Sequence, residues 1–520
     1  MEPVWDAVVI GAGMGGGFTA RSLAEAGYRV LLVDRGYSEP HGGPETGSPE
    51  SALAECRWPT EIACEVDGEI TRHFGIVGCG VGGSTNFYAG ALERFDRHDV
   101  DTHPQHPHPT GGWPITYDEL LPYYEEAERM LHVAGTRDPL DPERFEHLQQ
   151  PPDLGPADTQ FVQSFEKCGL HPYRLHVGIR YLPGCDECLT GLCKIKNCRA
   201  DARSAVAEAR IQPTVMDRTE AVRLVASHDK VSTAILRRDG QEIAVSARVF
   251  VLAAGAIHTP RLLLKSSGED WPDGLANRSG MVGRNLMFHS TLRFAMWPSK
   301  GLPGSGPRKS ISFRDFYFFQ GERLGSVQSS GFSAGYGDLL MHLYDTFDRG
   351  MLRWLGVARP FLRLPAALTI RLRGQGTIFA CCLEDLPYPD NRVAIDSNEP
   401  DGVLMKYNIR QELRDRSSRF EAVLEKHLAG QRMAFLTRGV NLNLSHACGT
   451  CTMGRDPKTS VIDRDCRAHG IGNLYVTDAS FMPTSAAINP SLTIAANALR
   501  VSESIKRALA GELQTELIGR

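Results

Sequence analysis

Residues 7–16 read AVVIGAGMGG, and this stretch decides the fold class of the 520-residue chain. The apolar, β-branched run that opens it suits a strand buried on both faces of a parallel sheet. The glycines that follow fit a strand-to-helix turn that holds a nucleotide. Gly11 permits the tight turn, Gly13 lets the backbone approach a pyrophosphate, and Gly16 lets the next helix pack closely against the strand.

The residues after this turn complete a βαβ unit. A helix is expected from about Phe18 to Ala26, and Met14 lies in the turn before it, where amide groups and the helix dipole would meet the phosphates. Residues 30–33 (VLLV) predict the second strand. Asp34 follows, placed to accept a hydrogen bond from a ribose hydroxyl, with Arg35 beside it. A GxGxxG pattern alone also fits an ordinary turn, but the whole series favours a dinucleotide site for FAD or NAD.

The overall composition excludes several classes of function. Hydrophobic residues at 42% and charged residues at 23% are ordinary for a globular enzyme, and a net charge of -5 gives no basis for nucleic-acid binding. No apolar run approaches the roughly 18–20 residues of a transmembrane helix, and the chain opens without a recognisable secretion signal. Thirteen cysteines without a small-scaffold pattern favour free thiols in a reducing cytoplasm.

The C-terminal part of the sequence supplies a candidate base. Residues 440–444 predict a strand that delivers His446, whose imidazole suits proton removal because its ordinary pKa is about 6.5. Residues 473–480 predict a buried strand of the nucleotide sheet. Asp478 and Ala479 fall at the C-terminal end of that strand, where cofactors bind in open α/β sheets.

Stretches spread over nearly the whole chain resemble the glucose-methanol-choline (GMC) oxidoreductase family, a group of FAD enzymes. They are GAGMGG at 11–16, GGSTN at 82–86, WP at 113–114 with PYY at 122–124, GAIHTPRLL at 255–263, VGRNL at 282–286 with His289, and HACGT at 446–450 with NPSLT at 489–493. The resemblance implies an α/β protein with a doubly wound, Rossmann-like FAD-binding domain and an α+β substrate domain built on an antiparallel sheet. It assigns residues 1–100, 200–290 and 440–520 to the FAD domain and residues 101–199 and 291–439 to the substrate domain.

The resemblance also implies FAD contacts beyond the first glycine turn. Val222 would offer its backbone to the adenine ring. The other expected contacts are Gly82, Gly83, Ser84, Asn86 and Ala254. Many family members carry an asparagine three residues after the serine, where this chain has Phe87, so the side chain that touches the flavin there is left open. Residues 74–96 contain no histidine, and we therefore predict that FAD is held without a covalent bond.

The family pattern pairs His446 with Asn489. The imidazole would remove the hydroxyl proton of an alcohol, and the Asn489 amide would donate a hydrogen bond to the developing alkoxide. Pro490 suits the first position of a helix expected to run to about Leu509, whose N-terminus, with Thr493, would face the flavin. Asn489 also suits a helix cap, and both roles are compatible. His289 is interpreted as structural.

The expected reaction is oxidation of a CH–OH group to an aldehyde or ketone, with hydride transfer to flavin N5. Residues 87–91 and the C-terminal motif resemble most the members that oxidise aminoglycoside or other sugar hydroxyls, a role in antibiotic biosynthesis. The alternatives are a sterol or hydrophobic alcohol oxidase, a hydroxynitrile lyase and a non-catalytic flavoprotein. The sequence leaves open whether oxygen or another acceptor takes the electrons.

Two further features allow more than one interpretation. Cys185, Cys188, Cys193 and Cys198 fall within fourteen residues, a density that suits an iron–sulfur cluster or zinc but also buried apolar thiols, and no metal is assigned. Residues 338–372 alternate apolar and basic side chains. Such a stretch docks on membranes in some proteins, whereas packing on the chain's own substrate domain is the preferred interpretation.

Overall fold

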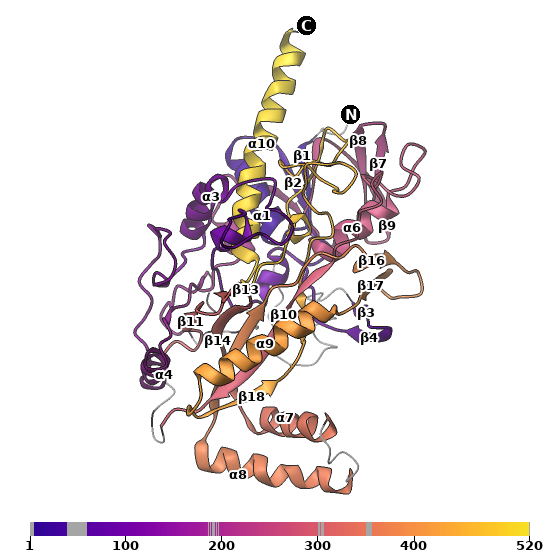
Figure 1. The fold of residues 1–520 in the computed structure, drawn as a ribbon. Coiled ribbons are helices and arrows are strands. Elements are labelled where there is room, and N and C mark those ends of the chain that lie inside the picture. The colour runs from indigo at the N-terminus through magenta and orange to yellow at the C-terminus, as the bar shows by residue number, and fades with distance from the viewer. Residues whose placement is uncertain are drawn as a thin grey trace.

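Strand β1 (Trp5–Ile10) lies in the middle of a parallel sheet, and its residues from Ala7 onward are fully buried (Figure 1). The computed structural model describes residues 5–38, 60–185, 187, 189, 193, 195, 197–299, 302, 306–349 and 356–518. β1 pairs in parallel with β2 (Val30–Val33) and with the second half of β9 (Gln241–Leu252). β6 (Thr214–Met216) and β20 (Leu474–Val476) extend the parallel part of the sheet. The doubly wound α/β prediction is confirmed.

Helices cover this sheet. α1 (Met14–Glu25) contacts α5 (Ala202–Ala207) and α10 (Ser491–Ile518), and α10 in turn contacts α3 (Tyr117–Met130). α6 (Gly255–Lys265) follows β9. α1 begins four residues before the position expected from the sequence, because the glycines at its start are helical and lie tightly against neighbouring backbone.

A second sheet is antiparallel, as predicted for the substrate domain. Its strand order is β18 (Met433–Thr437), β10 (Met287–Met296), β15 (Gly376–Leu383), β14 (Gly325–Ala334), β11 (Ile311–Phe313) and β5 (Tyr173–Arg174). β19 (Leu442–Cys448) also pairs with β10. The strand that carries His446 therefore belongs to the antiparallel sheet, although it directly precedes segments of the nucleotide domain.

One face of the antiparallel sheet is covered by α9 (Gln411–His427) and α4 (Pro156–Lys167) (Figure 1). Phe165 from α4 and Phe420 from α9 pack with Phe294 and Phe379 of the sheet in one buried cluster. Because side chains alternate along a strand, the residues next to these phenylalanines point to the opposite face. His289 of β10 and Gln328 of β14 lie on that opposite face, which meets the nucleotide domain.

The remaining described elements extend the first sheet, form small separate sheets or are further helices. β7 (Thr219–Ser227) and β8 (Lys230–Arg238) form an antiparallel extension with the first half of β9. A four-stranded sheet contains β16 (Arg392–Ile395), β17 (Val403–Tyr407), β3 (Ile62–Val66) and β4 (Glu69–His73), and a hairpin contains β12 (Phe318–Phe319) and β13 (Glu322–Arg323). Within the described residues, the other helices are η1 (Gly83–Asn86), η2 (Arg97–Asp99), α7 (Tyr336–Arg349), η4 (Gly356–Leu362), α8 (Arg363–Arg373) and η5 (Ala479–Phe481). Within the described part of the chain, no helix has the length and apolar character needed to cross a membrane.

Candidate active site

At one glycine of the first turn an added side chain would meet no protein atom, whereas at other glycines of the turn it would overlap the backbone. A Cβ atom at Gly11 would overlap the backbone of Ala253, and one at Gly16 would overlap the carbonyl oxygen of Gly11. A Cβ atom at Gly13, in contrast, would meet nothing within 4 Å. The turn is therefore closed toward the protein and open beside Gly13, as a site for a pyrophosphate requires.

Asp34 ties the end of β2 to two glycine loops. Its carboxylate accepts hydrogen bonds from the backbone N–H groups of Ala12 at 2.8 Å, Gly36 at 2.9 Å and Gly80 at 2.7 Å. Burial raises the pKa of this carboxyl group, and the three amide donors oppose that shift. Arg35 turns to other partners, with its guanidinium 2.9 Å from His258 Nε2 and 3.2 Å from Asp401 Oδ1.

The glycine-serine loop lies against the first glycine turn. A Cβ atom at Gly83 would come within 2.9 Å of the Cα atom of Gly13. Ser84 Oγ accepts a hydrogen bond from the backbone of Gly78 at 3.0 Å. Asn86 donates through Nδ2 to the Val81 carbonyl at 2.9 Å, while its buried Oδ1 has no hydrogen-bond partner in the described residues. A buried acceptor left over beside an open glycine turn fits a bound group with an N–H donor, such as a flavin.

The C-terminal end of β20 is held next to the start of α6. Asp478 accepts from the backbone N–H of Gly255 at 2.9 Å and from the Thr259 hydroxyl, and Thr259 in turn accepts from the backbone N–H of Ala254 at 3.1 Å. The carbonyl of Ala479 accepts from Gly449 N at 3.1 Å, which joins this end of the sheet to the segment after His446.

Three other predicted cofactor residues have defined positions. Val222 lies on β7 where the pairing with β8 skips a residue, so it sits in a β-bulge outside the regular ladder. Pro490 immediately precedes α10, and its carbonyl accepts the first helical hydrogen bond, from Ile494 N at 3.0 Å. The Thr493 hydroxyl is 2.7 Å from the Tyr124 hydroxyl of α3.

His446 forms a hydrogen bond with a second histidine. Its Nδ1 lies 2.7 Å from Nδ1 of His289, whose Nε2 is 3.0 Å from the carbonyl oxygen of Ser485. A carbonyl oxygen only accepts, so His289 Nε2 carries the proton and its Nδ1 is the acceptor. His446 then donates from Nδ1, which leaves its Nε2 as an unprotonated nitrogen. Two neutral imidazoles satisfy this arrangement.

The electrostatics of the site also favour a neutral His446. Desolvation, the nearby His289 and the charge of Lys309 lower the pKa of His446 well below its ordinary value. Burial lowers the pKa of His289 as well. Lys309 has only 6% of its surface exposed, and burial lowers its pKa to about 8.

Asn489 is also held by a residue of the antiparallel sheet. Its Oδ1 accepts a hydrogen bond from Gln328 Nε2 at 2.7 Å, which leaves the Asn489 NH₂ group for another acceptor. Gln328 Oε1 is buried and has no hydrogen-bond partner in the described part of the chain. Ser326, two residues earlier on β14, donates to the Ala487 carbonyl at 2.7 Å. The segment from Ser485 to Asn489 is thus fixed on the sheet face that carries His289.

The contributions of three of these residues do not follow from the sequence. The sequence favours a structural role for His289, because the partner on which the role of this histidine depends lies in a distant segment. Gln328 belongs to an alternating strand, GSVQSSG, so a polar inward face was readable there, but its bond to Asn489 was not. Lys309 follows an exposed arginine and carries no pattern that marks it as buried.

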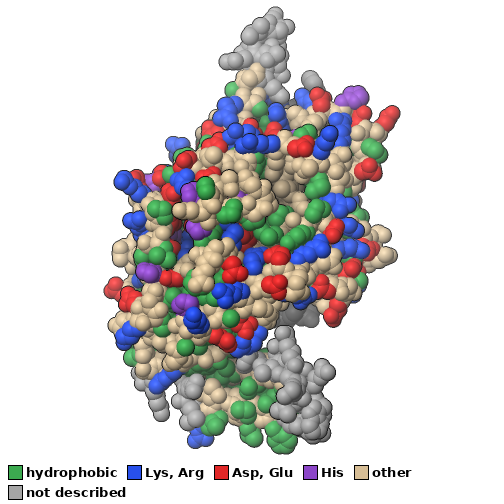
Figure 2. Space-filling model, viewed as in Figure 1, with side chains coloured by type: hydrophobic (Ala, Val, Ile, Leu, Met, Phe, Trp, Pro, Cys, Tyr) green, Lys and Arg blue, Asp and Glu red, His purple; other side chains and the backbone are tan. Residues whose placement is uncertain are grey.

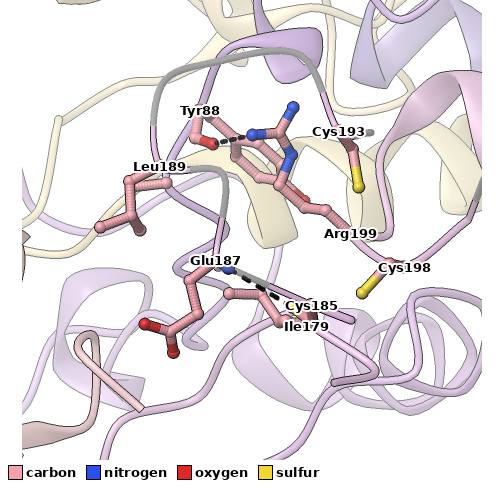
Figure 3. Close-up of a pocket in the computed structure, with 9 residues that line it drawn as sticks. Tyr88, Ile179, Cys185, Glu187, Leu189, Cys193, Cys198 and Arg199 are labelled. Atoms are coloured by element: carbon pink, nitrogen blue, oxygen red, sulfur yellow. Dashed lines mark hydrogen bonds between the residues drawn. The ribbon is translucent and has the colours of Figure 1, made fainter. Parts of the chain in front are cut away.

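The cysteine cluster surrounds a small pocket beside the glycine-serine loop (Figure 3). Cys185, Cys193 and Cys198 line it with Tyr88 and Arg199, while Cys188 lies outside the described residues. Burial raises the pKa of the Cys185 thiol to about 11, which disfavours a thiolate. In the residues that the structure describes, no group of three or more metal-binding side chains is arranged to hold an ion.

The fold and the site together define a class of protein. A nucleotide turn lies at one end of a doubly wound sheet. The His446 imidazole on the adjacent antiparallel sheet and the Asn489 amide, which precedes α10 and is bonded to that sheet through Gln328, are arranged as in a flavin-dependent alcohol oxidoreductase. The N-terminal and C-terminal domains of the GMC oxidoreductase family match residues 14–291 and 387–498. The chain belongs to this family, whose members bind FAD and oxidise alcohols.

Similar proteins cover almost the whole chain. 6'''-Hydroxyparomomycin C oxidase from Streptomyces lividus is 30% identical, with 98% of this chain and 93% of that protein aligned. Paromamine 6'-oxidase from Streptomyces fradiae is also 30% identical, over 98% of this chain and 92% of that protein. The crystal structure of pyridoxine 4-oxidase from Mesorbium loti has a TM-score of 0.63 at 19% identity, covering 96% of this chain and 99% of that one, and so supports the fold.

Proposed function

We propose that this FAD enzyme oxidises a CH–OH group of a sugar-like or aminoglycoside alcohol to an aldehyde or ketone. The unprotonated Nε2 that the His289–His446 hydrogen bond leaves on His446 carries the proposal, because it provides a base. The substrate class is supported by the two Streptomyces relatives, which are named for oxidation of aminoglycosides.

FAD supplies the hydride acceptor when it is bound. The protein supplies the remaining parts of the reaction. His446 Nε2 removes the hydroxyl proton of the substrate, and the Asn489 NH₂ group donates a hydrogen bond to the same oxygen as its negative charge develops. Proton removal and charge stabilisation at one oxygen lower the barrier to loss of the hydride from the adjacent carbon.

We infer that the residues around the open glycine position hold the cofactor. The space beside Gly13 would receive the pyrophosphate, and Asn86 Oδ1, which has no hydrogen-bond partner among the described residues, would accept a hydrogen bond from the flavin. The bulge at Val222 frees backbone groups for adenine, and the N-terminus of α10 after Pro490 directs its amides at the flavin. The absence of a histidine from residues 74–96 supports non-covalent attachment. Acid precipitation should then release the yellow colour into the supernatant, and colour retained in the pellet would contradict this.

We further propose oxygen as the electron acceptor and the cytoplasm as the location. Two relatives that are named as oxidases support the acceptor. Buried free thiols support a reducing compartment. These thiols belong to Cys64, Cys381, Cys382, Cys448, Cys451 and Cys466.

An anaerobic substrate screen tests the function. Aminoglycosides with a free primary hydroxyl, simple sugars, a sterol and short alcohols are each added to the holoenzyme while flavin absorbance is followed. We expect bleaching by the sugar-like alcohols, followed by formation of one peroxide per carbonyl when air is admitted. Bleaching by the sterol alone would contradict the substrate class, and substrate cleavage without bleaching would indicate a lyase. In the His446→Ala variant, flavin bleaching should be at least about a hundredfold slower while FAD stays bound.

A further inference from the structure

Helices α7 and α8, with η4 between them, expose large apolar side chains at one end of the molecule. The exposed fractions are 67% for Met341, 68% for Phe361, 69% for Leu364 and 56% for Leu368. We call these four residues the hairpin face. Figure 1 shows the two helices at the end of the molecule opposite the C-terminal part of α10, and Figure 2 shows green side chains gathered there. Exposed apolar side chains that cluster in this way mark an interaction surface.

The hairpin face is separate from the surface that packs on the chain's own core. Leu339 of α7 and Ala366 of α8 are buried in a cluster with Trp297 and Ile378 of the antiparallel sheet. In α8, Ala366 and Ile370 point toward this cluster, whereas Leu364 and Leu368 point away from it. Packing on the substrate domain, which the sequence favours for this stretch, therefore accounts for the buried side of α7 and α8. It does not account for the exposed side.

Positive charge surrounds the hairpin face. Arg363 and Arg371 are exposed on α8, each one or three residues from the exposed leucines. Arg359 of η4 is exposed as well, with its guanidinium carbon 4.0 Å from the ring centroid of Tyr344. Residues 336–373, which span α7, η4 and α8, contain six arginines and three aspartates (Asp338, Asp345 and Asp348, all in α7), a net charge of +3, although the whole chain has a net charge of -5. The charge of this region is thus opposite in sign to that of the rest of the molecule.

We propose that the hairpin face docks on a lipid bilayer that contains anionic headgroups. Leu364, Leu368, Phe361 and Met341 would enter the boundary between headgroups and acyl chains, while the arginines beside them reach the lipid phosphates. Arg363 and Arg371 flank the exposed leucines of α8 and suit this plane, because their long side chains can keep the charged groups in the headgroup layer while the leucines lie deeper.

Charge decides against a second copy of the chain as the occupant. A twofold contact through the hairpin face would bring Arg359, Arg363 and Arg371 of one copy against the same residues of the other, and such like-charge contacts are unfavourable. A bilayer with anionic lipids offers both the apolar interior and the opposite charge that this surface requires.

Sedimentation of the FAD-loaded full chain with vesicles tests the proposal. Vesicles of phosphatidylcholine alone are compared with vesicles that contain 30% phosphatidylglycerol, in low salt and in about 0.5 M NaCl, where charge interactions are strongly screened. We expect binding at least tenfold stronger to the anionic vesicles, and loss of most of that difference in high salt. Absence of binding to the anionic vesicles would overturn the proposal.

Two variants locate the surface, each with a matched control. Leu364→Ser combined with Leu368→Ser should abolish binding, whereas Ile211→Ser, which alters an apolar residue elsewhere with 52% of its surface exposed, should leave binding unchanged. Arg363→Gln should weaken binding about fivefold, the value of about 1 kcal/mol per basic residue near an anionic surface, and Arg455→Gln should not. Substrate oxidation in solution should be normal in all four variants, which shows that they fold. Equal vesicle binding by the double leucine variant and its control would overturn the proposal. The proposal would also be overturned if the protein did not bind vesicles but self-associated, and the leucine substitutions abolished that self-association.

Discussion

Nδ1 of His289 lies 2.7 Å from Nδ1 of His446, although the two residues are 157 positions apart in the sequence. The bond from His289 Nε2 to the Ser485 carbonyl fixes the direction of the first bond, because a carbonyl never donates. His289 is thereby a positioning residue that selects the tautomer of His446. Under the proposed mechanism, His289 sets which His446 nitrogen meets the substrate without touching the substrate itself.

Replacing His289 in two ways tests this positioning role. In His289→Asn, the side-chain oxygen replaces Nδ1 as acceptor, so the tautomer of His446 and most of the rate of flavin reduction should be retained. In His289→Gln, the amide reaches the Ser485 carbonyl but leaves His446 Nδ1 without its acceptor. We expect the rate to fall about tenfold or more, within the range of general-base effects, with little change in KM. The rates come from stopped-flow reduction under anaerobic conditions, and equal losses in both variants would show that His289 only supports the fold.

Gln328 should set the orientation of the Asn489 amide in the same manner. Gln328→Glu keeps the shape but replaces a donor with an acceptor, which would bind the Asn489 NH₂ group and turn its oxygen toward the substrate. We expect the rate of flavin reduction to fall about a hundredfold, as when an oxyanion donor is removed. Ser312→Ala is the control, because Ser312 is the partner of Gln328 in the neighbouring strand and, among the described residues, its hydroxyl donates to the Val327 carbonyl alone. A Gln328→Glu enzyme with the rate of this control would refute the assignment.

The pH dependence of the reaction follows from the lowered pKa of His446. In the proposed mechanism the neutral imidazole is the active form. A lowered pKa keeps the imidazole neutral in moderately acidic solution, so kcat/KM should remain level well below pH 6.5. Lys309 contributes to this shift by charge repulsion. Removing its charge in Lys309→Met stabilises the protonated imidazole, which raises the pKa of His446 and moves the acid limb of the profile to higher pH. A limb that stays in place or moves to lower pH would contradict the role assigned to Lys309.

The parts of the site that the sequence predicted are those that depend on local pattern. The glycine turn, the strand before it and the strand that carries His446 each follow from a few adjacent residues. The hydrogen bonds to His289 and Gln328 depend instead on register within a sheet and on a segment more than 150 residues away. Asp34 shows the same limit, because one of its three amide donors, Gly80, lies 46 residues further along the chain. The two faces of the α7–α8 hairpin also required the structure, since one amphipathic pattern fits both packing and docking.

Replacing either of two glycines of the first turn by alanine should affect a different property, which is stability at Gly16 and FAD affinity at Gly13. A Cβ atom at Gly16 would overlap the Gly11 carbonyl, so Gly16→Ala should lower the free energy of unfolding of the apoprotein by about 1–3 kcal/mol or more, as overpacking does. A Cβ atom at Gly13 meets no protein atom within 4 Å, so Gly13→Ala should leave the unfolding of the apoprotein unchanged. Because that methyl group would occupy the space assigned to the pyrophosphate, we expect the affinity for FAD to fall at least about tenfold. Thermal unfolding of the apoprotein and fluorescence titration with FAD separate the two effects. Normal FAD affinity in Gly13→Ala would place the cofactor elsewhere in the turn.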